Sequence, residues 1–237
     1  MIEPIYCLMI TGKSEERTWF AKNIGIPNFN MQKYPNKYLI IINHGTHIPI
    51  NQSNIIQHTF PRDSMTLGTL RNFSIEKVPY NGLYCIWDDD DFRPYDFLSI
   101  MHDTLVYNRA DAVFIKRRIE YNLANNFCFI SEFSNGTTHI FARKLDNLRY
   151  LNINTLEDVN LQEDLIKNKK KFIVIENSPQ MYIRIIHNNN TSPYATQYRN
   201  KIDIYSDDSN YKEFSITSEY KNYADDIILK HYKNFSS

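Results

Sequence analysis

Continuous apolar runs constrain the fold of this chain more than any other feature. Residues 38–43 (YLIIIN) and 83–87 (LYCIW) are apolar at nearly every position instead of alternating with polar residues. A strand buried on both faces, as in a parallel sheet covered by helices, has this pattern. Similar short runs occur at residues 5–10, 112–116 and 172–176. The chain is therefore expected to build a mostly parallel central sheet.

Segments expected to be helical separate these runs. They lie at residues 15–26, with Ser14 as a candidate N-cap, and at residues 67–77, 97–108 and 160–169. Strands that alternate with helices favour an α/β architecture, and no linker divides the chain into two domains. Weaker strand patterns and one C-terminal helical pattern lie at residues 54–60, 128–131, 138–142, 181–186 and 220–232.

The charge balance argues against two classes of protein. The 237 residues include 27 Lys and Arg and 27 Asp and Glu, so the formal net charge is zero. Nucleic-acid binders and polybasic membrane-surface proteins usually carry a basic excess, so neither class fits. The chain also lacks an apolar run of about 18–20 residues, so no transmembrane segment is expected.

The cysteines and the N-terminal residues indicate a cytoplasmic protein. Cys7, Cys85 and Cys128 each lie in an apolar stretch, and an odd count without metal-ligand spacing predicts buried, reduced thiols. The first residues, MIEPIYCLMITGK, lack the basic region and the small-residue cleavage site of a secretory signal. Frequent Ile and Asn indicate an AT-rich genome, bacterial or viral.

Four adjacent aspartates, Asp88 to Asp91, directly follow the apolar run at 83–87. In open parallel sheets, ligands bind beyond the carboxyl ends of the strands. Neighbouring carboxylates repel one another unless a cation or donors hold them, and their oxygens suit Mg²⁺ or Mn²⁺. On an extended segment, Asp88 and Asp90 point to one side and Asp89 to the other. We expect a nucleotide–metal site here; the alternative is a solvated acidic turn before the helix behind Pro94.

Segments in a fixed order carry a family resemblance. The longest is residues 67–94, LGTLRNFSIEKVPYNGLYCIWDDDDFRP, which agrees closely with the pattern LG.LRN..I..A.G.Y...WDDDD..P. The others are residues 7–17 (CLMITGKSEER), 29–45 (FNMQKYPNKYLIIINHG), 156–161 (LEDVNL) and 182–192 (YIRIIHNNNTS). Together they resemble the family 2 glycosyltransferases over about residues 4 to 192. The resemblance implies a single-domain α/β fold of the GT-A (Rossmann-like) type and a nucleotide-sugar donor.

The resemblance implies a metal site in the acidic run. Asp90 and Asp88 match the ends of the family's Asp-x-Asp motif. Asp90 is then a direct ligand of Mn²⁺ or Mg²⁺, and Asp88 holds ribose or metal-bound water. Asp91 either supports the loop or contacts the sugar. His187 matches a histidine that reaches the diphosphate or the metal. The metal stabilises the departing nucleoside diphosphate by its charge.

Other matched positions are expected to bind the nucleotide. By the resemblance, Thr11 contacts the nucleoside and Arg71 contacts the base or the diphosphate. Asp89 is also expected among the residues that bind the nucleotide sugar. In one departure, Asn43 and His44 stand where the family has two aspartates. Because Asn43 can still donate and accept hydrogen bonds at a base edge, a UDP-sugar remains the expected donor, with another nucleotide as the alternative.

The catalytic base is expected at the Glu-Asp pair of residues 157 and 158. Asp158 matches the family's general base, which takes the proton of the acceptor hydroxyl as that oxygen attacks the anomeric carbon. Glu157 is the alternative base, and the pair Glu163 and Asp164 offers a second register. A single attack inverts the anomeric configuration, as is typical of the family.

The resemblance thus implies an inverting, metal-dependent hexosyltransferase that acts on a hydroxyl of a glycan or other acceptor. Two alternatives stay open: a non-catalytic relative that binds sugar or protein, and a sugar-phosphate nucleotidyltransferase. The nucleotidyltransferases usually have a Gly-rich basic loop after the first strand, where this chain has only Gly12. The catalytic domain is expected at residues 1–192. The extension at 193–237 is expected to pack on it, and either covers the site or contacts another subunit.

Overall fold

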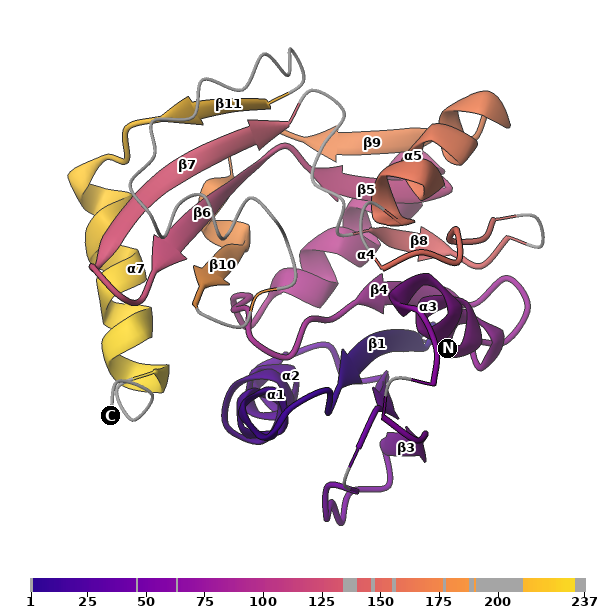
Figure 1. Cartoon of the computed structure of the whole chain (residues 1–237). Helices are drawn as coiled ribbons and strands as arrows, with labels where there is room; N and C mark the ends of the chain where they lie inside the picture. The colour runs from indigo at the N-terminus through magenta and orange to yellow at the C-terminus, as the bar shows by residue number, and fades with distance from the viewer. Residues whose placement is uncertain are drawn as a thin grey trace.

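The structure is a computed structural model that describes residues 2–45, 47–62, 64–133, 140–145, 148–154, 157–176, 178–187, 190 and 211–232. At residues 157–160, 162 and 211–214 it describes the backbone alone. This part of the chain builds a seven-stranded sheet and a four-stranded sheet, with helices packed against both (Figure 1).

The seven-stranded sheet is the predicted, mostly parallel central sheet. Its strand order is β3-β2-β1-β4-β8-β5-β9, and β8 runs antiparallel to its neighbours β4 and β5. The strands are β1 (Ile5–Thr11), β2 (Lys37–Asn43), β3 (Ile55–Thr59), β4 (Leu83–Ile86), β5 (Ala112–Ile115), β8 (Phe141–Arg143) and β9 (Phe172–Ile175). Thr11 is level with Asn43 in the register, so β1 and β2 end together at the edge where the acidic run leaves β4.

Helices cover both faces of this sheet, which explains why its strands are apolar at successive positions. A continuous helical segment is formed by α1 (Glu15–Phe20), the π-helix η1 (Ala21–Gly25) and α2 (Ile26–Met31). One face of the sheet packs against η1 and α2 of this segment and against α4 (Phe97–Asn108). The opposite face packs against α3 (Leu67–Glu76) and α5 (Glu157–Lys167). In β1, Cys7 and Met9 belong to the first core and Leu8 to the second.

The helix expected at residues 15–26 continues to Met31 and contains a π-turn at its centre. Ser14 caps it as predicted, because its Oγ accepts a hydrogen bond of 3.1 Å from the Arg17 N–H. Gly25 closes the π-turn against β1 and the acidic run. A Cβ at this position would lie 2.6 Å from Met9 Cε and 2.9 Å from Asp89 Cα. The wider turn and the missing side chain together let the helical segment pack directly against the acidic run.

The four-stranded sheet has the order β10-β6-β7-β11. Its strands are β6 (Arg117–Asn122), β7 (Phe127–Phe133), β10 (Ile183–Ile186) and β11 (Tyr211–Phe214). The sequence pattern did not predict β6, because Arg118 and Glu120 interrupt its apolar residues. The structure buries both and joins Arg118 Nε to Glu120 Oε1 at 2.7 Å, while Ile119 on the opposite face enters a third hydrophobic core.

The C-terminal helix α7 (Ser218–His231) lies beside β6 (Figure 1), and its apolar residues belong to that third core. Thr217 caps it, and Ala224 is buried against residues of β6, β10 and the α1 segment. Of the helices that the structure describes, none is both long enough and apolar enough to cross a bilayer. Cys7, Cys85 and Cys128 are free and buried, as predicted.

Candidate functional site

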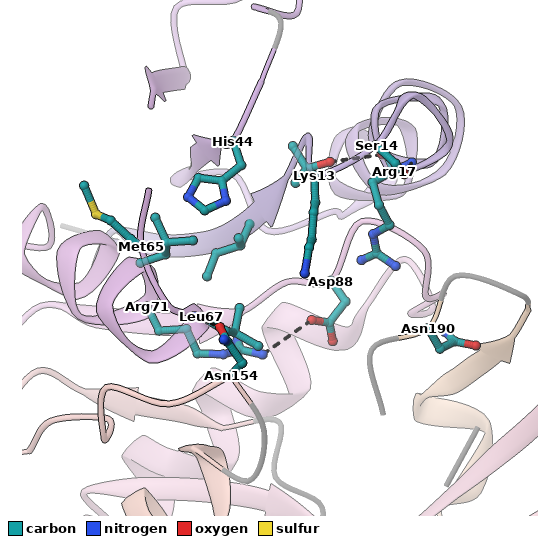
Figure 2. A pocket seen from close by; sticks show the side chains of 13 residues that line it. Lys13, Ser14, Arg17, His44, Met65, Leu67, Arg71, Asp88, Asn154 and Asn190 are labelled. Atoms are coloured by element: carbon teal, nitrogen blue, oxygen red, sulfur yellow. Dashed lines mark hydrogen bonds and ion pairs between the residues drawn. The ribbon is translucent and has the colours of Figure 1, made fainter. Parts of the chain in front are cut away.

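A pocket of about 590 Å³ opens at the edge of the large sheet where β1, β2 and β4 end (Figure 2). Its walls come from the end of β1, the loop into α1, the loop after β2, α3, the acidic run and the segment before α5. The lining residues are Ile10, Thr11, Lys13, Ser14, Arg17, His44, Met65, Leu67, Leu70, Arg71, Asp88, Asn154 and Asn190. The pocket therefore lies where the sequence predicted a ligand site.

Cations outnumber carboxylates in this lining. Lys13, Arg17 and Arg71 face the pocket together with Asp88. Arg71 Nη2 lies 4.0 Å from Asp88 Oδ1, and the Arg71 guanidinium lies 5.6 Å from the centre of the Tyr150 ring. The N–H donors of such side chains can bind the oxygens of a ligand that carries several negative charges.

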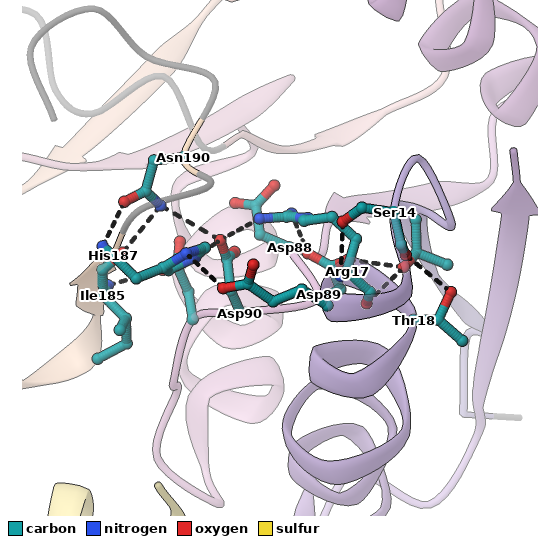
Figure 3. A network of polar contacts seen from close by, with 12 residues as sticks. Ser14, Arg17, Thr18, Asp88, Asp89, Asp90, Ile185, His187 and Asn190 are labelled. Atoms are coloured by element: carbon teal, nitrogen blue, oxygen red, sulfur yellow. Dashed lines mark hydrogen bonds and ion pairs between the residues drawn. The ribbon is translucent and has the colours of Figure 1, made fainter. Parts of the chain in front are cut away.

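The acidic run bends at Asp89 and Asp90, so its side chains do not alternate as predicted. Asp88 lines the pocket, whereas Asp89 and Asp90 both bind the guanidinium of Arg17 (Figure 3). The prediction that Asp89 points away from the side shared by Asp88 and Asp90 is therefore wrong. Arg17 provides the physical reason, because one cation between two carboxylates offsets their repulsion.

Asp89 is fully buried and is not among the residues that line the pocket. The Thr11 hydroxyl donates to Asp89 Oδ2 at 2.7 Å, and it also lies 3.0 Å from the Arg17 carbonyl oxygen. Burial raises the pKa of Asp89 to about 7, although Arg17 acts in the opposite direction. Asp89 thus holds the end of β1, through Thr11, and the guanidinium of Arg17 in place.

Asp90 accepts several hydrogen bonds at one carboxylate oxygen. Its Oδ2 receives Arg17 Nη1, lies 2.9 Å from His187 Nε2 and lies 3.4 Å from Asn190 Nδ2 (Figure 3). Burial alone would raise the pKa of Asp90, but Arg17 and His187 lower it to about 2. The structure thus brings together Asp90 and His187, which the sequence predicted as ligands of one metal.

Asp91 supports the loop, which was one of its two predicted roles. It accepts hydrogen bonds from the Tyr182 hydroxyl and, at 2.9 Å, from the Ile185 N–H. Beneath the run lies Arg93, fully buried, with its guanidinium 4.6 Å from the centre of the Trp87 ring and Nη2 3.8 Å from Asp88 Oδ2. A second cation therefore stabilises the carboxylates from inside the core.

The C-terminal helix also holds the acidic run. The hydroxyl of Tyr232, at the end of α7, donates a hydrogen bond of 2.8 Å to the Asp90 carbonyl oxygen, and Tyr232 is buried. This contact joins the last described residue of the chain to the backbone of the predicted metal ligand.

Replacing Tyr232 with Phe is expected to lower the free energy of unfolding by about 1–2 kcal/mol, because the buried Asp90 carbonyl loses its donor. Urea unfolding followed by circular dichroism measures the change. The control, Tyr107→Phe, removes a hydroxyl from a residue that is 88% exposed, and is expected to leave the free energy of unfolding unchanged. Equal unfolding free energies for the two variants would contradict the role of Tyr232.

The remaining predicted residues fall into three groups: those that line the pocket, one that is buried away from it, and two whose side chains the structure does not describe. His44 lines the pocket, as do Thr11 and Arg71, whereas Asn43 is fully buried and is not part of the lining. The reason is the packing of two loops, since a Cβ on Gly12 would lie 1.9 Å from Asn43 Oδ1. The side chains of Glu157 and Asp158 lie outside the described residues, and the backbone there begins α5.

Nine of the thirteen lining residues were not predicted as part of the site, and Lys13, Arg17 and Asn190 are three of them. Lys13 and Arg17 lie within the matched segment 7–17, and Asn190 lies within 182–192, so the matches had already marked their neighbourhood. No spacing rule indicated them, because their roles depend on how the loop after β1 and the residues after β10 fold against the acidic run.

Within the described part of the chain, no group of three or more His, Cys, Asp or Glu residues is arranged to hold a metal by itself. Mg²⁺ in nucleotide sites typically takes one or two carboxylates from the protein and further oxygens from the phosphates. Asp90 supplies one such carboxylate, and the imidazole of His187 lies beside it at 2.9 Å. The chemistry of these groups fits a divalent ion that arrives with a diphosphate.

No protein-family model matches the sequence, and no curated protein matches it either. Solved structures do match. S. aureus TarS (residues 1–349) in complex with UDP-GlcNAc has a TM-score of 0.62 at 12% identity, over 79% of this chain and 60% of TarS. The mannosyltransferase PcManGT from Pyrobaculum calidifontis, in complex with GDP-Man and Mn²⁺, has a TM-score of 0.58 at 10% identity, over 79% of this chain and 59% of PcManGT. Both are GT-A-type proteins.

The chain has the GT-A fold. The mostly parallel sheet and its flanking helices agree with this assignment, which the sequence predicted. The chain spans about 60% of the length of TarS 1–349 and of PcManGT, and 37% of the length of a longer S. aureus TarS structure. A GT-A fold at this level of identity fixes the architecture, and the activity has to be argued from the site.

Proposed function

We propose that this chain is a family 2 glycosyltransferase that moves a hexosyl group from a nucleotide-diphosphate sugar to a hydroxyl of a glycan or other glycoconjugate. The donor is a UDP-sugar, the reaction needs Mn²⁺ or Mg²⁺, and the anomeric configuration is inverted. The observation that supports this most is the pocket at the ends of β1 and β4, where Lys13, Arg17 and Arg71 face Asp88.

Each side of the pocket suits one part of such a donor. Lys13, Arg17 and Arg71 supply donors for the oxygens of a diphosphate, and Arg can do so in a bidentate manner. Ile10, Met65 and Leu70 supply apolar surface against which a base can pack. Asp88 lines the pocket as a hydrogen-bond acceptor and suits a ribose hydroxyl.

Asp90 and His187 are the proposed protein ligands of the divalent ion. Their side chains lie 2.9 Å apart in this structure, and carboxylate and imidazole are both ordinary ligands of Mn²⁺. When bound, the ion supplies positive charge that stabilises the nucleoside diphosphate as a leaving group. Arg71 and Lys13 in the pocket lining add positive charge.

Asp158 is the proposed general base, and Glu157 is the alternative. Asn154 lines the pocket, and three residues of chain reach at most about 11 Å, so the start of α5 lies near the pocket. A carboxylate there can take the proton of an acceptor hydroxyl while that oxygen attacks the anomeric carbon from the face opposite to the diphosphate. One such displacement inverts the anomeric centre.

The test is release of nucleoside diphosphate from a panel of UDP-, GDP-, ADP- and dTDP-sugars, with Mn²⁺, with Mg²⁺ and with a chelator. We expect slow hydrolysis of at least one UDP-sugar that needs the metal, and faster release when a sugar acceptor is added. Turnover of a sugar phosphate with a nucleoside triphosphate would support a nucleotidyltransferase instead. Donor binding without any turnover would support a non-catalytic sugar-binding relative.

Arg71→Gln is expected to weaken UDP affinity in the presence of Mn²⁺ by at least about 10-fold, because a charge-assisted hydrogen bond to the donor contributes about 1.5–3 kcal/mol. Isothermal calorimetry measures this. Lys77→Gln removes the same charge at the end of α3, from an exposed residue that stacks on Phe73, and is expected to leave the affinity unchanged. Equal affinities for both variants would remove Arg71 from the site.

A further inference from the structure

Arg17 lies between the acidic run and the pocket. Its backbone is fixed at the start of α1, where the N–H donates to Ser14 Oγ at 3.1 Å and the carbonyl oxygen lies 3.0 Å from the Thr11 hydroxyl. Its side chain is 19% exposed and lines the pocket, while its two terminal nitrogens bind Asp89 and Asp90. Figures 2 and 3 show the same guanidinium facing the pocket and joined to the acidic run.

In this arrangement Arg17 occupies the carboxylate that a metal would need. Arg17 Nη1 binds the same oxygen, Asp90 Oδ2, that lies 2.9 Å from His187 Nε2. A divalent ion placed between Asp90 and His187 would stand next to a guanidinium of like charge in a largely buried site. Such repulsion is strong where the effective dielectric constant is low. The ion and the present Arg17 pairing therefore compete for one oxygen.

Arg17 can take a new partner when that oxygen is given up. Its two hydrogen bonds to Asp89 and Asp90 use two of the five N–H donors of a guanidinium, whose planar fork fits phosphate oxygens well. The pocket that it lines also has Lys13 and Arg71 on its walls. A diphosphate bound there presents anions to Arg17 at the moment when a metal claims Asp90.

We propose that Arg17 exchanges partners between Asp90 and the phosphates of the bound donor, and so makes metal binding depend on the donor. This inference rests on the proposed nucleotide-sugar function. Without a diphosphate, Arg17 holds Asp90 and opposes the metal. With a diphosphate, Arg17 turns to the phosphates, and Asp90 and His187 receive the ion. Metal and nucleotide then bind with positive coupling, and each raises the affinity of the site for the other by the same factor.

The test compares wild type with Arg17→Gln, using Mn²⁺ alone, UDP alone and both together. Free Mn²⁺ is followed by electron paramagnetic resonance and UDP by calorimetry. We expect Arg17→Gln to bind Mn²⁺ alone about 10-fold more tightly and to bind UDP in the presence of Mn²⁺ about 10-fold more weakly, so that most of the coupling is lost. Unchanged or weaker binding of Mn²⁺ alone would overturn the proposal.

Two further variants separate partner exchange from a general loss of charge. Lys13→Gln removes a cation from the same pocket, and among the described contacts Lys13 makes no ion pair with the acidic run. It is expected to weaken UDP binding without changing the affinity for Mn²⁺ alone. Arg17→Lys keeps the charge but cannot span Asp89 and Asp90, so it is expected to give an intermediate affinity for Mn²⁺ alone.

Stability gives a readout that does not depend on activity. Because Arg17→Gln leaves two carboxylates without their cation, its melting temperature is expected to fall, and Mn²⁺ is expected to raise it more than in wild type. A wild-type chain that binds no nucleoside diphosphate with Mn²⁺ would contradict the proposed function. Tight UDP binding with no difference in Mn²⁺ affinity between wild type and Arg17→Gln would contradict partner exchange alone.

Discussion

Asp90→Asn is expected to weaken Mn²⁺-dependent UDP binding by at least about 100-fold, equivalent to about 2.8 kcal/mol. The metal loses its anionic protein ligand, and His187 alone holds a divalent ion poorly. The change keeps the size of the side chain and leaves the bond from Tyr232 to the Asp90 carbonyl in place. Calorimetry with UDP, in Mn²⁺ and in chelator, measures the effect.

The control for this variant is Asp103→Asn on α4. The side chain of Asp103 is 81% exposed. Its replacement by Asn removes the same charge as Asp90→Asn, and is expected to leave UDP affinity unchanged. A normal Mn²⁺-dependent affinity in Asp90→Asn would refute the metal assignment. UDP binding that resists chelation in wild type and is lost in Arg17→Gln would show that Arg17 replaces the metal.

Asp158→Asn is expected to keep donor binding and to lower the transfer rate by about 10³-fold, because a positioned general base contributes about 10²–10⁴-fold. The amide is close in size to the carboxylate but does not take up a proton. UDP affinity by calorimetry and the rate of sugar transfer in the same preparation separate binding from chemistry.

Variants of the neighbouring carboxylates test whether Asp158 is the general base. Glu157→Gln tests the alternative base in the same turn of α5. Glu163→Gln and Asp164→Asn test the second Glu-Asp pair, where Glu163 is exposed. Each of these variants is expected to keep at least about one tenth of the wild-type rate, since none loses the base. A larger loss in one of them, with normal transfer in Asp158→Asn, would move the base to that residue.

The central sheet was predictable because burial on both faces leaves a simple pattern. The continuous apolar runs at β2 and β4 are such a pattern, and both are confirmed as parallel neighbours of β1. The strand β6 was missed because a buried ion pair, Arg118 with Glu120, replaces apolar residues on one of its faces. Pattern reasoning assumes that buried means apolar, and β6 breaks that assumption.

The candidate site was predictable in its place but not in its internal geometry. The acidic run after β4 indicated the pocket edge, and Thr11, His44, Arg71 and Asp88 all line it. The contact of Arg17 with both Asp89 and Asp90 was not predictable, since it depends on the π-turn at Gly25 that brings α1 against the run. Local sequence patterns hold no information on such long-range packing.

A crystal structure of the protein soaked with UDP and Mn²⁺ tests the nucleotide-sugar site most directly. We expect an anomalous Mn²⁺ peak between Asp90 and His187, with the diphosphate against Arg71 and Lys13 and the Arg17 guanidinium turned from Asp90 to a phosphate oxygen. A nucleotide bound away from the ends of β1 and β4, or a Mn²⁺ peak that does not touch the acidic run, would contradict this expectation.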